Sequence, residues 1–462
     1  MNPKSNSISS ESNSWTRRHI LHSTSAGFGW LAFNALHQQY AHAAAPPKTI
    51  NPLAPKAPHF AAKAKRVIFM FMQGGPSHLD TFDYKPELVK AHEQKVAKYM
   101  GTAFDFKPRG KSGIMISEAF PELSKHADDL CILNGMQTRT NAHQMATVAL
   151  HIGSETFVRP SMGAWIVYGL GTEAEDLPGF VTINPVADTG GAMNYGSAFL
   201  PASFQGTRLS TTGGGVPDLS NGRLSDAQQR KQIEFIQKAN RRLLAGDPGN
   251  PELEGIIQSY ELAYKMQTSV PDVLDLDQEP AHIRELYGLD NVDTERFGTQ
   301  CLMARRLTEK GVRFIQLTST GWDHHQQLRE GITRQASSID KPIAGLIADL
   351  KQRDMLKDTL ILWGCEFGRG SSYDNEPYNG RGHNGRGYTM WMAGGGVKGG
   401  FAYGSTNAMG DTAETGIITT HDLHATVLHL LGINHERLTY RYSGRNFRLT
   451  DVHGEVAKDI IA

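Results

Sequence analysis

Residues 312–325 read VRFIQLTSTGWDHH, an apolar, β-prone run that leads into a carboxylate and two imidazoles. A second run of the same kind, residues 359–363, leads into the polar stretch CEFGR at residues 365–369. Strands of this type deliver the side chains that follow them to the carboxyl edge of a parallel sheet, where open α/β sheets bind their ligands. The two stretches therefore predict an α/β fold with one site at that edge.

Other stretches extend this pattern along the chain. Residues 66–72 and 388–393 are compact apolar runs that glycine-rich loops stop, which is typical of buried strands. Helical patterns cover residues 141–152, 296–310, 339–354 and 421–431. The alternation of helix and strand between residues 296 and 363 predicts a parallel sheet with helical crossovers.

The N-terminal residues predict export. Arg17 and Arg18, a modest apolar run at residues 26–36 and small residues around His42 predict a twin-arginine-type signal peptide over residues 1–45. The apolar run is too short and too polar for a stable membrane span. A basic, disordered tail without function is the alternative. We therefore expect a protein exported to the periplasm or the cell surface.

The rest of the chain divides by composition. Residues 46–60 are rich in proline and predict a linker, so that the α/β domain covers residues 61–462. The segment from about residue 221 to residue 295 is polar and has a strongly helical pattern, which predicts a helical insertion with a solvated face.

Composition excludes several classes of function. The 47 basic residues balance the 47 acidic ones, so no global charge favours nucleic acid or an anionic membrane. Three cysteines are too few and too scattered for a disulfide framework or a cysteine-rich metal site. The chain contains neither a P-loop nor a dinucleotide fingerprint. Nothing in the sequence indicates the oligomeric state.

Carboxylates and imidazoles at the predicted sheet edge indicate a metal site, because Asp, Glu and neutral His are the usual ligands of zinc and similar ions. The expected ligands are Asp323, His325, Glu366 and His383, with His78 and Asp80 added from the loop after residues 66–72. Alternatively, Asp80 caps a turn and the next helix, and the polar residues satisfy one another without binding anything.

Three further residues are expected to take part in catalysis. His143 begins a predicted helix, and a helix N-terminus is a good seat for an anion such as phosphate or sulfate. Arg369 and Arg381 could hold such an anion through bidentate hydrogen bonds. His143 could act as a nucleophile, as a general acid or as a metal ligand.

An ordered set of motifs resembles the bacterial family called domain of unknown function 1501. The motifs are FMQGGPSHLDTFD, GWDHH, CEFGRG followed by GRGHN, AGGGVKGG and DLHATVLHLLG, and they run from about residue 66 to the C-terminus. That family is grouped with the alkaline phosphatase and sulfatase superfamily and is often exported by twin-arginine signals. The resemblance implies a doubly wound, mostly parallel sheet flanked by helices and a metal-dependent ancestry.

The resemblance also implies roles for single residues. Asp323, His325 and His383 resemble the ligands of the first metal, and Glu366 stands where the superfamily usually has an Asp-His pair for the second. The chain departs from the pattern at two positions. Gln73 replaces an Asp after the first strand, and His143 replaces the nucleophilic Ser, Thr or modified Cys.

These observations predict a metal-dependent hydrolase of phosphate or sulfate esters. Zinc is the expected ion, with manganese and calcium as alternatives, and the partner is a small-molecule or polysaccharide ester. Two other functions stay open. One is a non-catalytic metal- or ligand-binding protein on a degenerated hydrolase fold, and the other is a metal-dependent hydrolase of a different bond, in polysaccharide or peptide.

Overall fold

A computed structural model describes residues 51–96, 98–211, 224–248, 250–374 and 379–462. The chain divides into a unit of residues 1–50 and a compact unit of residues 51–462. The predicted signal peptide and the start of the predicted linker lie outside the described residues. Residues 51–60 contain neither helix nor strand, but they contact the domain: Leu53 is buried, and the Lys56 N–H donates to the Leu170 carbonyl.

A nine-stranded sheet forms the centre of the domain, in the order β12-β4-β11-β8-β1-β7-β5-β6 with β15 beside β4. Its strands are β1 (Arg66–Met72), β4 (Leu130–Gln137), β5 (Phe180–Ile183), β6 (Thr207–Leu209), β7 (Phe314–Ser319), β8 (Thr359–Gly364), β11 (Tyr388–Ala393), β12 (Phe401–Tyr403) and β15 (Ile418–Thr419). Among these strands, β11 alone runs antiparallel to its neighbours. The central strands β1, β7 and β8 are buried along almost their whole length, as the apolar runs predict.

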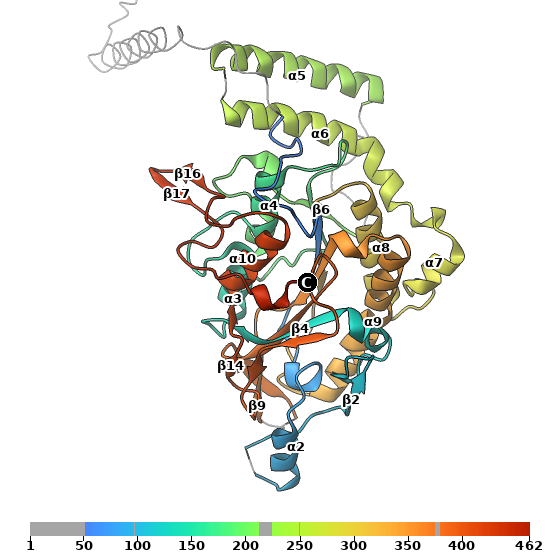
Figure 1. Ribbon diagram of the computed structural model, residues 1–462. Coiled ribbons are helices and arrows are strands. Elements are labelled where there is room, and N and C mark those ends of the chain that lie inside the picture. The colour runs from blue at the N-terminus through green and yellow to red at the C-terminus, as the bar shows by residue number, and fades with distance from the viewer. Residues whose placement is uncertain (1–50, 97, 212–223, 249, 375–378) are drawn as a thin grey trace, which may run out of the picture. The chain divides into compact units, whose positions relative to one another are not determined.

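Helices cover both faces of the sheet (Figure 1). On one side lie α3 (His143–Ile152), α4 (Met162–Leu170) and α10 (Thr420–Leu430), and on the other lie α8 (Glu295–Glu309) and α9 (Leu328–Gln352). Gly163 allows α4 to approach the sheet closely, because a Cβ there would lie 2.7 Å from the rings of Phe180 and Phe314. The predicted doubly wound, mostly parallel α/β fold is confirmed.

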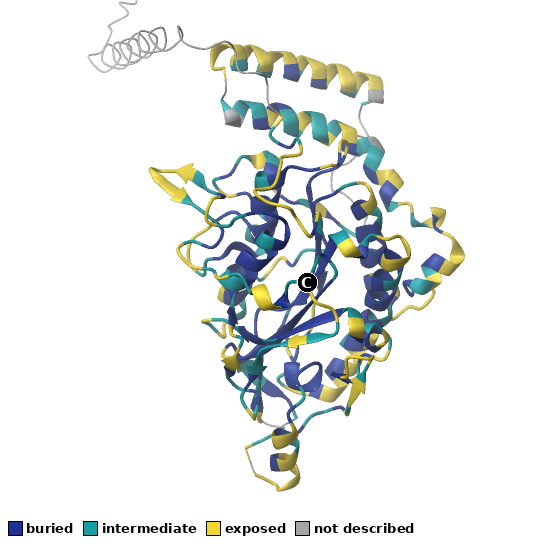
Figure 2. Cartoon of the chain, in the orientation of Figure 1, coloured by how far each residue is buried: buried dark blue, intermediate teal, exposed yellow. Residues whose placement is uncertain are grey.

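The described residues of the segment predicted as an insertion form three α-helices, α5 (Asp226–Gly246), α6 (Pro251–Leu274) and α7 (Ala281–Leu286). Most of α5 is exposed (Figure 2). This helix begins with a capping box, in which the side chain of Ser225 accepts from the Gln228 N–H and the Gln228 side chain reaches back.

Short elements complete the domain. They are α2 (Pro86–Glu93) and the strand pairs β2 (Phe106–Arg109) with β3 (Ile114–Ser117), β13 (Ser405–Thr406) with β14 (Ala413–Thr415), and β16 (Tyr440–Tyr442) with β17 (Arg445–Phe447). No helix in the described part of the chain has the length and apolar character needed to cross a membrane. The three cysteines are buried and unbonded.

The segment between Glu366 and His383 contains regular structure. Strands β9 (Gly368–Tyr373) and β10 (Arg381–Asn384) pair there as an antiparallel hairpin, with residues 375–378 outside the described part. Glycine and arginine have little intrinsic preference for strands. Here Arg369 and Arg381 are fully buried and donate to carbonyl groups of neighbouring loops, and these long-range contacts override the local preference.

Candidate metal centre

Five polar side chains gather at the carboxyl edge of the sheet, and we call them the Asp323 cluster. Asp323 and His325 follow β7, Glu366 follows β8, His383 lies on β10, and His143 is the first residue of α3. The loop after β1 packs against the same edge. Gly74 has φ +116°, and a Cβ there would lie 2.7 Å from the Asp323 backbone nitrogen, so only glycine fits this close approach.

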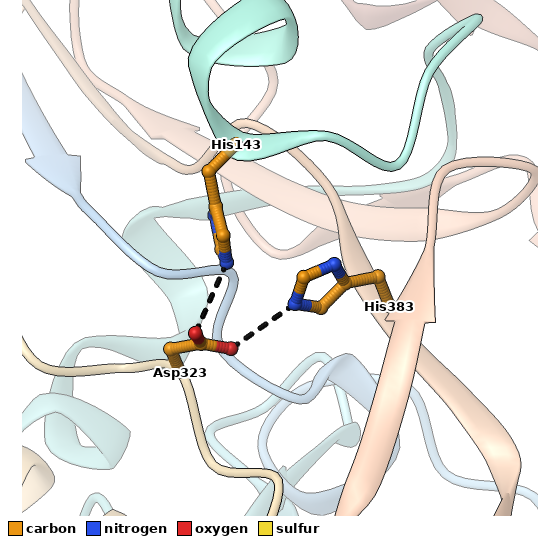
Figure 3. A group of neighbouring side chains, drawn as sticks. All are labelled: His143, Asp323 and His383. Atoms are coloured by element: carbon orange, nitrogen blue, oxygen red, sulfur yellow. Dashed lines mark hydrogen bonds and ion pairs between the residues drawn. The ribbon is translucent and has the colours of Figure 1, made fainter. Parts of the chain in front are cut away.

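The Asp323 carboxylate is the centre of the cluster (Figure 3). Its Oδ2 lies 3.3 Å from Nε2 of His143, and its Oδ1 lies 2.9 Å from Nε2 of His325 and 3.1 Å from Nε2 of His383. Nε2 of His325 and Nε2 of His383 are themselves only 2.9 Å apart. Each of the three imidazoles therefore directs Nε2 at the Asp323 carboxylate, and the ligand atoms of His143, Asp323 and His383 lie within 4.8 Å of one another.

The other ring nitrogen of each imidazole, Nδ1, contacts an oxygen of a residue other than Asp323. Nδ1 of His143 lies 2.6 Å from Oε1 of Glu366, and Nδ1 of His325 lies 2.5 Å from Oδ2 of Asp374. Nδ1 of His383 donates to the backbone carbonyl of Asn141 at 2.8 Å. A carbonyl or carboxylate oxygen accepts a hydrogen bond. All three imidazoles therefore carry a proton on Nδ1.

This arrangement leaves a lone pair on Nε2 of every neutral imidazole. Lone pairs of His325 and His383 would then face each other across 2.9 Å, and the lone pair of His143 would face a carboxylate oxygen. Such contacts are repulsive unless a proton or a cation lies between the atoms. Nε2 of His143 is buried and makes no hydrogen bond in the described part of the protein. The inner side of the cluster is thus built for a positive charge.

The charges around Asp323 keep it ionised. Burial by itself would raise the pKa of the Asp323 carboxyl, but contacts with two imidazoles and with the Arg369 guanidinium hold that pKa well below its usual range. Nη2 of Arg369 donates to Oδ1 of Asp323 at 2.5 Å.

His143 shows the opposite shift. Burial of the imidazole would lower its pKa, but the carboxylates of Asp323 and Glu366 outweigh that effect and raise the pKa of His143 to about 9. His143 is therefore protonated at neutral pH, which places a positive charge beside the two carboxylates.

The cluster is closed on one side and open on the other. The Glu366 side chain is fully buried, its Oε1 also accepts from the Gly74 N–H at 2.9 Å, and its Oε2 has no partner among the described residues. The side chains of Asp323 and His325 are 42% and 41% exposed. A ligand from solvent can therefore reach the cluster from the Asp323 side.

The structure does not bring Asp80, His78 or Arg381 into this cluster. Asp80 and Arg381 are fully buried and form an ion pair at 2.8 Å, and Asp80 also accepts from the Ser77 hydroxyl. Nε2 of His78 lies 2.8 Å from the Gly410 carbonyl oxygen. We call these four residues, Ser77, His78, Asp80 and Arg381, the Asp80 group.

The two predicted arginines hold protein groups. Nε of Arg369 donates to the Gly75 carbonyl and its Nη1 to the Arg381 carbonyl, while Nη2 contacts Asp323 and the Gly74 carbonyl. Arg381 divides its donors between Asp80 and backbone carbonyls. Both guanidinium groups are fully buried, so they position parts of the site from within the protein.

Sequence reasoning missed Asp374, which contacts Nδ1 of His325. Asp374 follows β9, and only the pairing of β9 with β10 places it beside His325. Sequence reasoning also could not distinguish the roles of the adjacent residues His324 and His325. His324 is buried with both ring nitrogens unpartnered among the described residues, and burial lowers its pKa to about 4.

The fold and the cluster define an α/β protein with a candidate metal centre at the sheet edge. The model of the family described as "Protein of unknown function (DUF1501)" matches residues 64–461. The chain belongs to this family, as its motifs predict. A comparison with curated proteins gives no match.

Solved structures resemble the chain at low identity. A sulfatase from Pseudoalteromonas sp. is 12% identical, with 86% of this chain and 72% of that chain covered at a TM-score of 0.38. The alkaline phosphatase of the Antarctic bacterium TAB5 is 11% identical (81% and 99% covered, TM-score 0.35). A phosphonate monoester hydrolase from Silicibacter pomeroyi is 12% identical (80% and 73% covered, TM-score 0.36). Likeness at this level assigns neither a substrate nor a site residue to this chain.

Proposed function

We propose that the protein is an exported, metal-dependent hydrolase of phosphate or sulfate esters. One observation carries the metal part of this proposal. Three imidazoles, each with its Nδ1 proton held by an outside oxygen, direct Nε2 at one ionised carboxylate. Export rests on the predicted signal peptide over residues 1–45.

The residues of the cluster fit a divalent ion, and zinc best. Zinc binds imidazole nitrogen and carboxylate oxygen at about 2.0–2.2 Å, so neighbouring ligand atoms of a tetrahedron lie about 3.3 Å apart. Here each Nε2 lies 2.9–3.3 Å from a carboxylate oxygen of Asp323, and the ligand atoms of His143, Asp323 and His383 lie within 4.8 Å of one another. Manganese and calcium prefer oxygen ligands, and a set with three nitrogens suits them less well.

A divalent ion bound here would lower the pKa of water to about 7 and would act as a Lewis acid on an ester oxygen. The protein contributes the geometry. Asp323 and the imidazoles would bind the ion, and Arg369 holds Asp323 in place through Nη2. Helix α3 begins at His143 without a side-chain cap, so the free N–H groups and positive dipole of its first turn lie beside the cluster and can attract an anionic ester.

The same contacts decide among the roles open to His143. Both of its ring nitrogens point at carboxylates, Nδ1 at Glu366 and Nε2 at Asp323. A nucleophile needs a nitrogen directed at the substrate. We therefore assign His143 as a ligand, and water as the attacking group.

A specific observation favours a second candidate, a non-catalytic metal-binding protein. Three imidazoles contact one carboxylate, which offers up to four protein ligands, and a four-coordinate site without an open position is typical of structural zinc. The exposure of Asp323 and His325 favours the hydrolase, because it leaves room for a further ligand from solvent.

The experiment is a screen of aryl phosphate monoesters, phosphodiesters and aryl sulfates with zinc, manganese or calcium added to metal-free protein. We expect zinc-dependent turnover of at least one class, and a loss of at least about 1000-fold in Asp323→Ala and His383→Ala. His282→Ala, on an exposed position of α7, is the matched control and keeps full activity. Turnover that survives chelation or the Asp323→Ala change would contradict the proposal, and metal binding without turnover on any class would favour the non-catalytic protein.

A further inference from the structure

Two carboxylates, those of Glu366 and Asp374, contact the outer nitrogens of imidazoles in the Asp323 cluster. Glu366 was expected to be a metal ligand, but its Oε1 is already occupied twice, by Nδ1 of His143 at 2.6 Å and by the N–H of Gly74 at 2.9 Å. Asp374 lies against Nδ1 of His325 in the same manner, at 2.5 Å. Both carboxylates therefore contact the far side of an imidazole whose near side faces Asp323.

We infer that the centre holds one cation per chain, bound by Asp323 and by Nε2 of His143, His325 and His383, and that Glu366 and Asp374 are positioning residues. The inference rests on the metal binding in the proposed function. It assigns to Glu366 and Asp374 the orientation of His143 and His325.

A carboxylate behind a metal-binding imidazole has two effects. It fixes the tautomer, because the proton stays on Nδ1, and it makes Nε2 a stronger electron donor. It also fixes the plane of the ring. For His143 the Phe367 ring adds a second constraint, with centroids 4.7 Å apart, and the same Phe367 ring lies 4.6 Å from the ring of His383.

Among the described residues, the neighbourhood of Glu366 lacks the further ligands that a second cation would need. Zinc sites require at least three protein ligands. The residue after Glu366 is Phe367, an apolar ring that packs on two imidazoles, and the residue directly after β1 is the uncharged Gln73. The free Oε2 of Glu366 is a single buried oxygen. Oε1 of Glu366 instead faces Nδ1 of His143, 2.6 Å away.

The experiment measures cation stoichiometry and affinity directly, without an activity assay. Metal-free protein is titrated with zinc by calorimetry, and the zinc content is checked by elemental analysis. We expect one zinc per chain in the wild type. Glu366→Gln and Asp374→Asn are expected to keep one zinc and to bind it about 10- to 100-fold more weakly. The control, Asp105→Asn, removes an exposed carboxylate outside the cluster and keeps the wild-type affinity.

Two results would overturn the inference. The first is two zinc ions per chain in the wild type, with one lost in Glu366→Gln, which would make Glu366 a ligand. The second is an unchanged affinity in both Glu366→Gln and Asp374→Asn. Thermal melts of the metal-free variants guard against misfolding, and Asp374→Asn is the safer variant because Asp374 is part-exposed while Glu366 is fully buried.

Cobalt substitution separates this inference from the proposed function. The intensity of the visible absorption of Co²⁺ distinguishes four ligands from five or more. One cobalt with five ligands, including an exchangeable water, supports both proposals. One cobalt with four ligands, none of them an exchangeable water, supports the single-cation centre and contradicts hydrolysis at this site. Failure of the protein to bind any cation overturns both.

Discussion

Two groups of acid, imidazole and arginine side chains lie near the carboxyl edge of the same sheet, and they differ in what their polar atoms contact. In the Asp80 group, Asp80 pairs with Arg381, and both side chains are fully buried. In the Asp323 cluster, Asp323 is 42% exposed and three imidazoles direct their Nε2 atoms toward it. The polar atoms of the first group pair with one another, whereas the second group holds three imidazoles against one carboxylate, and we propose it as the cation site.

The difference shows that residue type does not identify a site. Both groups carry the side chains that bind metals, and both follow buried strands. What distinguishes them is whether each donor meets an acceptor. A buried ion pair that is fully hydrogen-bonded is part of the fold, while several acceptor atoms held against one another are what a cation-binding site would need.

The largest expected effect comes from removing the central carboxylate of each group. Asp80→Ala leaves the Arg381 guanidinium buried without its charge partner, so we expect a loss of about 3–5 kcal/mol in the free energy of unfolding. Asp323→Ala is expected to cost at most about 1–2 kcal/mol, because the site is partly exposed and Arg369 keeps its carbonyl partners. Denaturant unfolding of the metal-free proteins measures both.

Zinc binding should be affected in the reverse order, with the larger loss in Asp323→Ala. Asp80→Ala, refolded at low temperature, keeps its zinc site, whereas Asp323→Ala loses it. The comparison breaks down in either of two cases: Asp323→Ala is the more destabilised of the two metal-free variants, or it still binds zinc with wild-type affinity.

A smaller effect is expected from zinc on the stability of the wild-type protein. A ligand that binds only the folded state stabilises it by about 2.7 kcal/mol at one hundred times its Kd. We expect this gain in the wild type and its absence in Asp323→Ala, measured as the shift in unfolding midpoint with zinc or with chelator. An equal gain in both proteins would place the zinc elsewhere.

The smallest effect concerns the protonation of one histidine from each group. Burial lowers the pKa of His78, whereas nearby carboxylates raise the pKa of His143 to about 9. In the metal-free protein, His143 therefore stabilises the fold below its unfolded pKa of about 6.5, and this contribution is lost as pH rises through 9. For His78 the loss comes instead as pH falls below about 6.5.

Zinc competes with the His143 proton, so its affinity should rise with pH by up to tenfold per unit, which is about 1.4 kcal/mol, until about pH 9. Nitrogen chemical shifts of the histidine rings give the two titrations, and calorimetry in buffers of different ionisation heat counts the protons released. A His143 that is neutral at pH 7 without metal, or zinc binding that is independent of pH, would remove this distinction between the groups.

The sequence predicts the fold well because burial of apolar runs decides it. The runs at residues 66–72 and 388–393 coincide with β1 and β11, and His143 lies at the start of its helix as expected. Asp323, His325, Glu366 and His383 meet at one place because the strands before the first three are neighbours of β1 in the sheet, and the carboxyl ends of neighbouring parallel strands adjoin.

The sequence could not predict which polar groups satisfy one another. That Arg381 meets Asp80, and that Asp374 meets His325, depends on the hairpin of β9 and β10, whose residues have weak strand preferences. The direction of adjacent side chains was also beyond local patterns: His324 turns into the protein against Gly331, while His325 faces the cluster.

Anomalous scattering at the zinc edge, from a crystal of the zinc-loaded protein, tests the central claim most directly. We predict one zinc peak per chain, bonded to the Asp323 carboxylate and to Nε2 of His143, His325 and His383, with Glu366 and Asp374 outside the coordination sphere. Zinc bonded to Asp80 or Glu366, or no peak at the Asp323 cluster, would contradict the account.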